Sequence, residues 1–98
     1  MITAIVNVSC VVDRIPEVGQ AIAEIDGVSE VYSVAGDVDL VALVRVRRHE
    51  DLADVIAGRL NKVEGVQATQ TLIAFQAYSR HDLEATFDLG LDNPDLEP

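Results

Sequence analysis

The chain contains no tryptophan, and its 98 residues include only two tyrosines, two phenylalanines and one cysteine. Because 49% of the residues are nevertheless hydrophobic, the core must be built almost wholly from aliphatic side chains. The single cysteine, Cys10, excludes an internal disulfide and is typical of a reducing compartment. The chain shows no signal-peptide pattern and no apolar run near the roughly 20 residues of a membrane-spanning helix. We therefore expect one small domain in the cytoplasm.

Positive charge is also scarce. Seven basic residues face 17 acidic ones, which gives a formal net charge of −10 and an isoelectric point near 4.3. A nucleic-acid-binding protein needs a positive surface for phosphate contacts, and the densest basic cluster is only Arg45, Arg47 and Arg48. We therefore expect no direct nucleic-acid binding and no attraction to an anionic membrane surface.

The hydrophobic residues that are present follow two periodicities. Alternation with period two predicts strands over residues 2–12, 28–35, 39–47 and 66–78. Apolar spacings of three and four predict a helix from Asp13 and Pro16 to Gly27, and another from His49 to Gly65. The acid-Gly-Val sequence at residues 26–28 recurs 38 residues later. Two such β-α-β halves predict an α+β, ferredoxin-like antiparallel sheet with both helices on one face.

The third predicted strand is apolar on both faces, over Leu40 to Val44. A sheet with one face in water should alternate between apolar and polar residues. We therefore predict that the helix-free face packs against a second copy, forming a homodimer and then a higher homo-oligomer. The predicted domain covers residues 1–78, and residues 79–98 are predicted to form a short C-terminal helix and an acidic tail.

Two motifs carry a family resemblance. The Gly36-Asp37-Val38-Asp39 turn opens the apolar third strand, and Gly65-Val66-x-x-Thr69-x-Thr71 begins the fourth. In this order and spacing they resemble the effector-binding (RAM) domain of the Lrp/AsnC transcription regulators, over residues 1 to about 78. A helix-turn-helix domain precedes this domain in the family, whereas here the first strand begins at residue 2. We therefore expect a stand-alone form that acts on full-length Lrp/AsnC regulators by mixed assembly.

The resemblance also implies a site, because family members bind amino acids or related small metabolites between dimers. It implies ligand contacts from Gly36, Asp37, Val38, Asp39, Thr69, Thr71 and Tyr32. An aspartate can pair with the ligand ammonium, backbone N–H groups of the turn can hold its carboxylate, and threonines offer hydroxyls.

Each of these residues also has a structural interpretation. Asp37 fits ordinary turn chemistry, and the threonines fit ordinary strand propensity. Asp39 stands where aspartate is disfavoured in a strand, so ligand contact and structural turn bonding remain equal alternatives. Tyr32 either lines the pocket or packs at the subunit interface.

No arrangement of residues predicts an active site, a metal or a cofactor. His49 fits a helix start, and His81 beside Asp82 makes a poor metal site. A dimeric α+β barrel enzyme of the monooxygenase type remains an alternative, with Asn7 as its one buried polar candidate. An ACT-like regulatory module is another, although the segment Asp13–Pro16 lacks the glycine usual in its ligand loop. The sequence favours a non-enzymatic amino-acid-binding regulatory domain.

Overall fold

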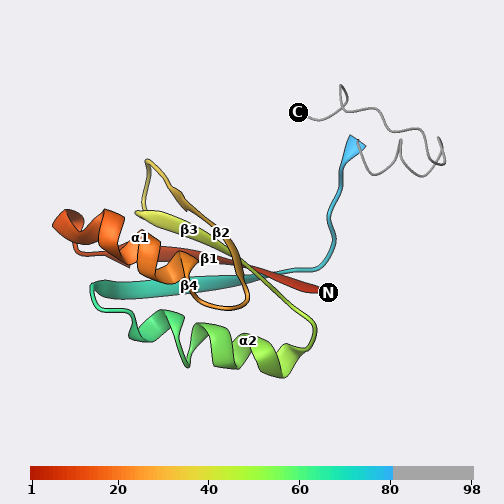
Figure 1. Cartoon of the computed structure of the whole chain (residues 1–98). Helices are drawn as coiled ribbons and strands as arrows, with labels where there is room; N and C mark the ends of the chain where they lie inside the picture. The colour runs from red at the N-terminus through yellow and green to blue at the C-terminus, as the bar shows by residue number, and fades with distance from the viewer. Residues whose placement is uncertain (81–98) are drawn as a thin grey trace.

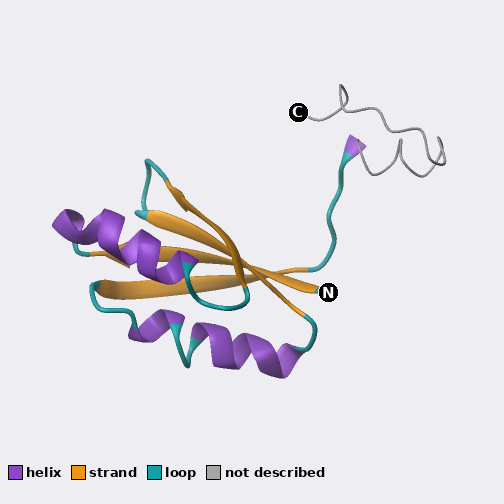
Figure 2. Ribbon diagram, in the orientation of Figure 1, coloured by secondary structure: helices purple, strands orange, loops and turns teal. Residues whose placement is uncertain are grey.

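The computed structural model describes residues 1–80. Its four strands form one antiparallel sheet in the spatial order β2-β3-β1-β4. They are β1 (Ile2–Cys10), β2 (Val28–Ser33), β3 (Leu40–Val46) and β4 (Val66–Ala74). Helices α1 (Ile15–Ala23) and α2 (His49–Ile56) lie on the same face of the sheet (Figure 1). The ferredoxin-like α+β fold predicted from the sequence is confirmed, with one helical and one sheet layer (Figure 2).

Several element ends differ from the prediction. The strands are shorter than predicted at one end or both, and a 3₁₀ turn over Val12–Arg14 follows β1. The largest error concerns α2, which ends at Ile56 instead of continuing to Gly65. The backbone N–H groups of Ala57 and Gly58 both donate to the Ala53 carbonyl at 3.0 Å, so the regular ladder stops there. Glycine is a poor helix former, which favours this break.

A second 3₁₀ turn, Leu60–Lys62, then leads to β4 and keeps Leu60 fully buried. The apolar stripe of α2 is thus preserved although the helix is not continuous. The predicted C-terminal helix and acidic tail fall almost entirely on residues 81–98, outside the described residues.

The core lies between the sheet and the helices and is aliphatic, as predicted. Alternate residues of the two central strands supply one side of it: Ala4, Val6, Val8, Cys10, Leu40, Ala42, Val44 and Val46. The helical layer supplies the other side: Val18, Ile22, Leu52, Val55, Ile56 and Leu60. Within residues 1–80 no polar or charged residue is buried. This core holds both ends of β3 in place, and a cavity opens at each of them.

The opposite face of the sheet has no helical cover (Figure 1). Ile5, Val41 and Leu43 lie there half-buried, on strands whose register places Ile5 opposite Leu43. Asn7, expected as a buried polar residue, also lies there, only partly buried, and its Nδ2 donates to Gln70 Oε1 at 3.4 Å. The apolar character predicted for both faces of β3 is therefore present in the structure.

Candidate functional site

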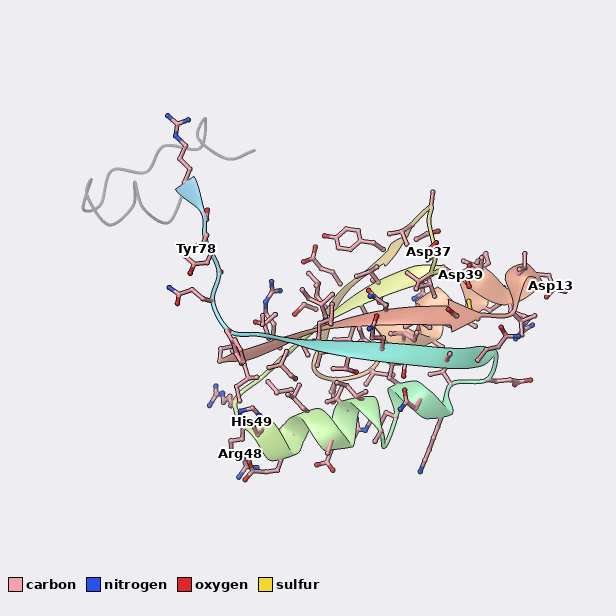
Figure 3. The ribbon with its side chains drawn as sticks, turned by 180° about the vertical axis from the view of Figure 1, so that it is seen from behind. Asp13, Asp37, Asp39, Arg48, His49 and Tyr78 are labelled. Carbon is pink, nitrogen blue, oxygen red and sulfur yellow. The ribbon has the colours of Figure 1, made fainter. Side chains whose placement is uncertain are left out.

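The turn between β2 and β3, residues 34–39, closes through a hydrogen bond from Val34 N–H to Asp39 O at 3.1 Å. Gly36 adopts a φ of +148°, a region that favours glycine, as the sequence predicted. A Cβ atom at Gly36 would meet no atom within 4 Å. Asp37 is exposed on this turn, and Asp39 lies at its β3 end (Figure 3). The turn is therefore open to a ligand or to another subunit.

The two aspartates of the turn differ in what they contact. Asp39 Oδ2 accepts a hydrogen bond from Cys10 N–H at 2.9 Å, and Asp39 N–H donates to Val8 O at 2.9 Å. The Asp39 carboxylate thus extends the hydrogen bonding between β1 and β3 beyond their last backbone pair. Of the two interpretations left open for Asp39, structural bonding is observed. Asp37 makes no hydrogen bond or ion pair with any residue of the described chain, so its carboxylate is available.

Cys10 is buried beside this turn, and its burial, followed by the charge of Asp39, raises the pKa of the Cys10 thiol. The unfolded chain therefore ionises at a lower pH than the folded chain. Stability should be unaffected by this group below the ordinary thiol pKa of about 8.5, and should fall as the pH rises from there through the folded-state pKa.

We expect the free energy of unfolding to decline between about pH 8 and 10 in the wild type and to decline less in Cys10→Ala, as measured by urea denaturation. If the free energy of unfolding falls equally steeply with pH in the two proteins, Cys10 does not contribute to the pH dependence of stability. Cys10→Ala is the matched control because it keeps a small apolar side chain and removes only the titrating group.

An apolar groove of about 340 Å³ opens at the base of the turn, between α1 and the β2 edge of the sheet. Ser33 and Leu40, which directly flank the turn, belong to its wall. The remaining lining residues come from α1 and from the middle of β2: Ile15, Pro16, Gly19, Gln20, Ala23 and Val31. A Cβ on Gly19 would stand 3.5 Å from Leu40 Cδ2, so the missing side chain leaves part of this space open. The groove therefore offers apolar walls with two polar groups, from Ser33 and Gln20.

Sequence reasoning did not identify the α1 side of this groove. Gly19 and Ala23 are small residues four positions apart on a helix, and they therefore share one face of it. Two small residues at this spacing are the feature of the sequence that could have predicted the groove. The apolar stripe of α1 instead predicted only its large residues, which pack into the core.

The predicted threonines lie elsewhere. Thr69 and Thr71 are paired with Val8 and Val6, so both face the helical side of the sheet. Thr69 Oγ1 donates to Asn61 Oδ1 at 2.9 Å. Thr69 is two strands away from Leu40, or about 10 Å at the usual strand spacing. The threonines and the turn therefore do not converge within one chain.

Tyr32 lies on the helix-free face, opposite Val41, and is 48% exposed. Its hydroxyl donates to the Glu30 carboxylate, which also lies 3.9 Å from Arg45. Tyr32 therefore does not line the groove of its own chain. The seven predicted site residues are spread over both faces of the sheet, and only the four turn residues stand together.

The apolar groove beside the open glycine-aspartate turn has a volume and a mostly apolar lining typical of small-molecule sites. The model of the Lrp/AsnC ligand-binding domain matches residues 3–83, so the chain belongs to this family. This result confirms the resemblance seen in the sequence and decides against the ACT-like alternative. Across residues 1–80, no cluster of side chains is suited to a metal ion, and no helix is long and apolar enough to cross a membrane.

The relatives are regulators. An uncharacterised HTH-type transcriptional regulator of Pyrococcus horikoshii is 39% identical over 59 residues, which cover 60% of this chain and 39% of that protein. The regulator LrpA of the same organism is 35% identical over 54 residues, covering 55% of this chain and 38% of that protein. The chain thus spans about two-fifths of the length of these relatives.

Two solved structures extend the comparison. A protein of Thermus thermophilus is 50% identical with a TM-score of 0.77, covering 82% of this chain and all of that chain. The feast or famine regulatory protein of M. tuberculosis, solved in complex with L-methionine, is 27% identical with a TM-score of 0.66. That match covers 82% of this chain and 54% of the other.

Proposed function

We propose that this chain is a non-enzymatic, cytoplasmic regulatory domain that binds an amino acid or a related small metabolite at the β2–β3 turn. The observation that carries the proposal is the apolar groove of about 340 Å³ at the base of a turn that presents an uncommitted carboxylate, Asp37. Membership of the Lrp/AsnC ligand-binding domain family supports it.

The chemistry of the turn suits a free α-amino acid. The Asp37 carboxylate pairs with the ligand ammonium in a charge-assisted hydrogen bond. Backbone N–H groups around Gly36 hold the ligand carboxylate, and the ligand side chain enters the groove beside Leu40. L-Methionine is the first ligand to test, because its flexible apolar side chain suits irregular apolar walls. A related protein has also been solved with that amino acid.

We infer that a second chain completes the site, because residues 34–37 of the turn are exposed in a single subunit. We propose that two copies pack their helix-free faces together and that such dimers assemble further, bringing Thr69 and Thr71 of another copy towards the turn. Several large apolar side chains outside the core support association. Tyr32 and Leu72 are 48% and 46% exposed, and Phe75 and Tyr78 are 99% and 87% exposed. Tyr78 lies on the segment that leads away from the sheet (Figure 3).

A thermal-shift screen with the twenty amino acids tests the binding site. A ligand at about 100 times its dissociation constant should stabilise the protein by roughly 2.7 kcal/mol. We expect at least one amino acid to raise the melting temperature of the wild type but not that of Ala23→Phe, which fills the groove from the exposed end of α1. Ala53→Phe, on the exposed side of α2, is the matched control and should respond like the wild type. The proposal fails if no amino acid stabilises the wild type, or if Ala23→Phe responds fully.

Light scattering coupled to gel filtration tests the assembly. We expect the wild type to elute with a mass of at least two 10.6 kDa chains. Leu43→Glu, which places a charge in the middle of the helix-free face, should shift the protein to monomers because a buried unpaired charge is strongly unfavourable. Ala53→Glu, placed on α2, should leave the mass unchanged. A monomeric wild type would exclude assembly through this face.

The same face supports mixed assembly with full-length Lrp/AsnC regulators. Native mass spectrometry of this chain incubated with a purified regulator of the family should reveal complexes that contain both chains. If only homo-oligomers form under conditions where the subunits of each protein exchange, the chain does not act by mixed assembly.

A further inference from the structure

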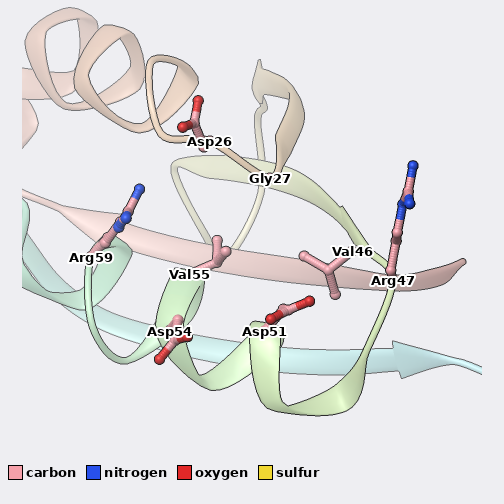
Figure 4. Close-up of a pocket in the computed structure, with 8 residues that line it drawn as sticks. All are labelled: Asp26, Gly27, Val46, Arg47, Asp51, Asp54, Val55 and Arg59. Carbon is pink, nitrogen blue, oxygen red and sulfur yellow. The ribbon is translucent and has the colours of Figure 1, made fainter.

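A second cavity, of about 270 Å³, lies at the opposite end of β3 from the turn. Its floor is made by Gly27, Val46 and Val55. Its rim carries five charged side chains, from the loop before β2, the end of β3 and the helical segment that follows: Asp26, Arg47, Asp51, Asp54 and Arg59 (Figure 4). We call this cavity the charged pocket.

The opposite charges of the charged pocket are not paired with one another. In the described part of the chain, the ion pairs within 4 Å are Arg45–Glu30 and Arg48–Asp51. Neither Arg47 nor Arg59 therefore contacts an acidic group, although three carboxylates line the same cavity and the chain carries a net charge of −10. The two arginines stand at opposite ends of the pocket (Figure 4). Separated opposite charges of this kind suit a ligand that carries both signs.

The floor of the charged pocket is apolar and held in place. Arg45 N–H donates to Gly27 O at 2.8 Å, which fixes the loop before β2 to β3. Gly27 has a φ of +100°, and a Cβ there would stand 2.8 Å from Val55 Cγ2. Val46 and Val55 are 8% and 7% exposed, so they form a firm surface on which a hydrocarbon chain can lie. The pocket thus joins an apolar floor to a charged rim before any ligand arrives.

We propose that the charged pocket binds a compact molecule that carries one carboxylate and two ammonium groups on a short aliphatic chain, the chemical class of a basic amino acid. Arg48 already pairs with Asp51 at 3.3 Å, so Asp26 and Asp54 are the two rim carboxylates left to receive the two ammonium groups. The ligand carboxylate binds Arg59, the ammonium groups bind Asp26 and Asp54, and the methylene chain lies on Val46 and Val55. This site is separate from the turn and its groove.

Amide shifts in the ¹⁵N spectrum of the whole chain test the proposal with three probes. L-Lysine has all the proposed groups, L-norleucine lacks the side-chain ammonium, and cadaverine lacks the carboxylate. We expect L-lysine to shift the amides of Gly27, Val46 and Val55, and the other two probes to bind at least about tenfold more weakly. Since tenfold in affinity corresponds to about 1.4 kcal/mol, each missing contact should be detectable.

Two variants and one control complete the test. Asp54→Asn and Arg59→Gln should each lower the affinity for L-lysine by at least about tenfold. Glu17→Gln, on the exposed surface of α1, should leave that affinity unchanged. The proposal is overturned if L-lysine shifts none of the three amides, if cadaverine binds as tightly as L-lysine, or if neither variant weakens binding. Shifts at Ser33, Gly36 and Leu40 report on the turn instead, so failure of one site is distinguishable from failure of the other.

Discussion

Replacing Gly65 by alanine should lower the free energy of unfolding by about 2–4 kcal/mol, although the substitution removes no contact. Gly65 has a φ of +100°, a conformation that L-residues adopt only at a cost of about 1–2 kcal/mol. A Cβ there would also stand 2.7 Å from Cγ2 of Val18, which is 1% exposed and cannot move without disturbing the core. Urea denaturation followed by circular dichroism measures the change.

Gly19→Ala is the matched control for Gly65→Ala. Gly19 lies within α1 at a negative φ, and its new Cβ would stand at an ordinary contact distance of 3.5 Å from Leu40. An alanine in a helix interior is more stable than a glycine by about 0.5–1 kcal/mol, so this variant should gain stability. If both variants lose the same amount, the strain assigned to residue 65 is wrong.

Replacing Asp39 by alanine should lower the free energy of unfolding by about 1–3 kcal/mol, because it leaves the Cys10 N–H without its acceptor. Asp37→Ala should change stability by less than about 0.5 kcal/mol, since Asp37 is exposed and has no partner within residues 1–80. Asp39→Asn keeps a side-chain oxygen in place and should fall between the two. The comparison needs only equilibrium unfolding of the three variants and the wild type.

The same three variants separate stability from binding. If the assignments are correct, Asp37→Ala lowers the affinity for the amino acid but not the stability of the fold. Asp39→Asn lowers the stability more than Asp37→Ala does. A fully stable Asp39→Ala that no longer binds the amino acid would reverse the assignments, and would make Asp39 the ligand contact.

The fold could be predicted from the sequence because its determinants are local and repeated. The two glycines that end the helical segments, Gly27 and Gly65, both adopt a φ of +100°, and each precedes a strand that begins with valine. Alternation along β1 predicted a strand with two distinct faces, and one face, from Ala4 to Cys10, is buried. The early end of α2 was missed because the apolar stripe continues through Leu60, although the backbone changes from an α-helix to a 3₁₀ turn.

The candidate site was predicted less completely, because its contacts join residues that are distant in sequence. The bond between Asp39 and Cys10 spans 29 positions, and no local pattern reveals it. The charged pocket was missed for the same reason: Asp26 and Arg59 line one cavity only after the helical segments have packed on the sheet. Residue types along the chain identified the turn, but they did not show which of its two carboxylates is free.

The proposed location of the site between subunits has a regulatory consequence. If the ligand binds between dimers, it binds the assembled state more tightly than the separate dimers, and by linkage it stabilises the assembly. We therefore expect the amino acid that raises the melting temperature also to shift dimers towards larger assemblies in light scattering. Ligand binding with no change in mass at any protein concentration would place the whole site within one dimer.

The most direct test of the central claim is an amide-shift titration of the wild type and Ala23→Phe, with L-methionine first and then with the amino acid that gives the largest thermal shift. The account predicts saturable shifts centred on Ser33, Gly36 and Leu40 in the wild type, and their loss in Ala23→Phe. Saturable shifts that fall elsewhere in the chain, or that are unchanged when the groove is filled, would contradict the assignment of the β2–β3 turn as the amino-acid site.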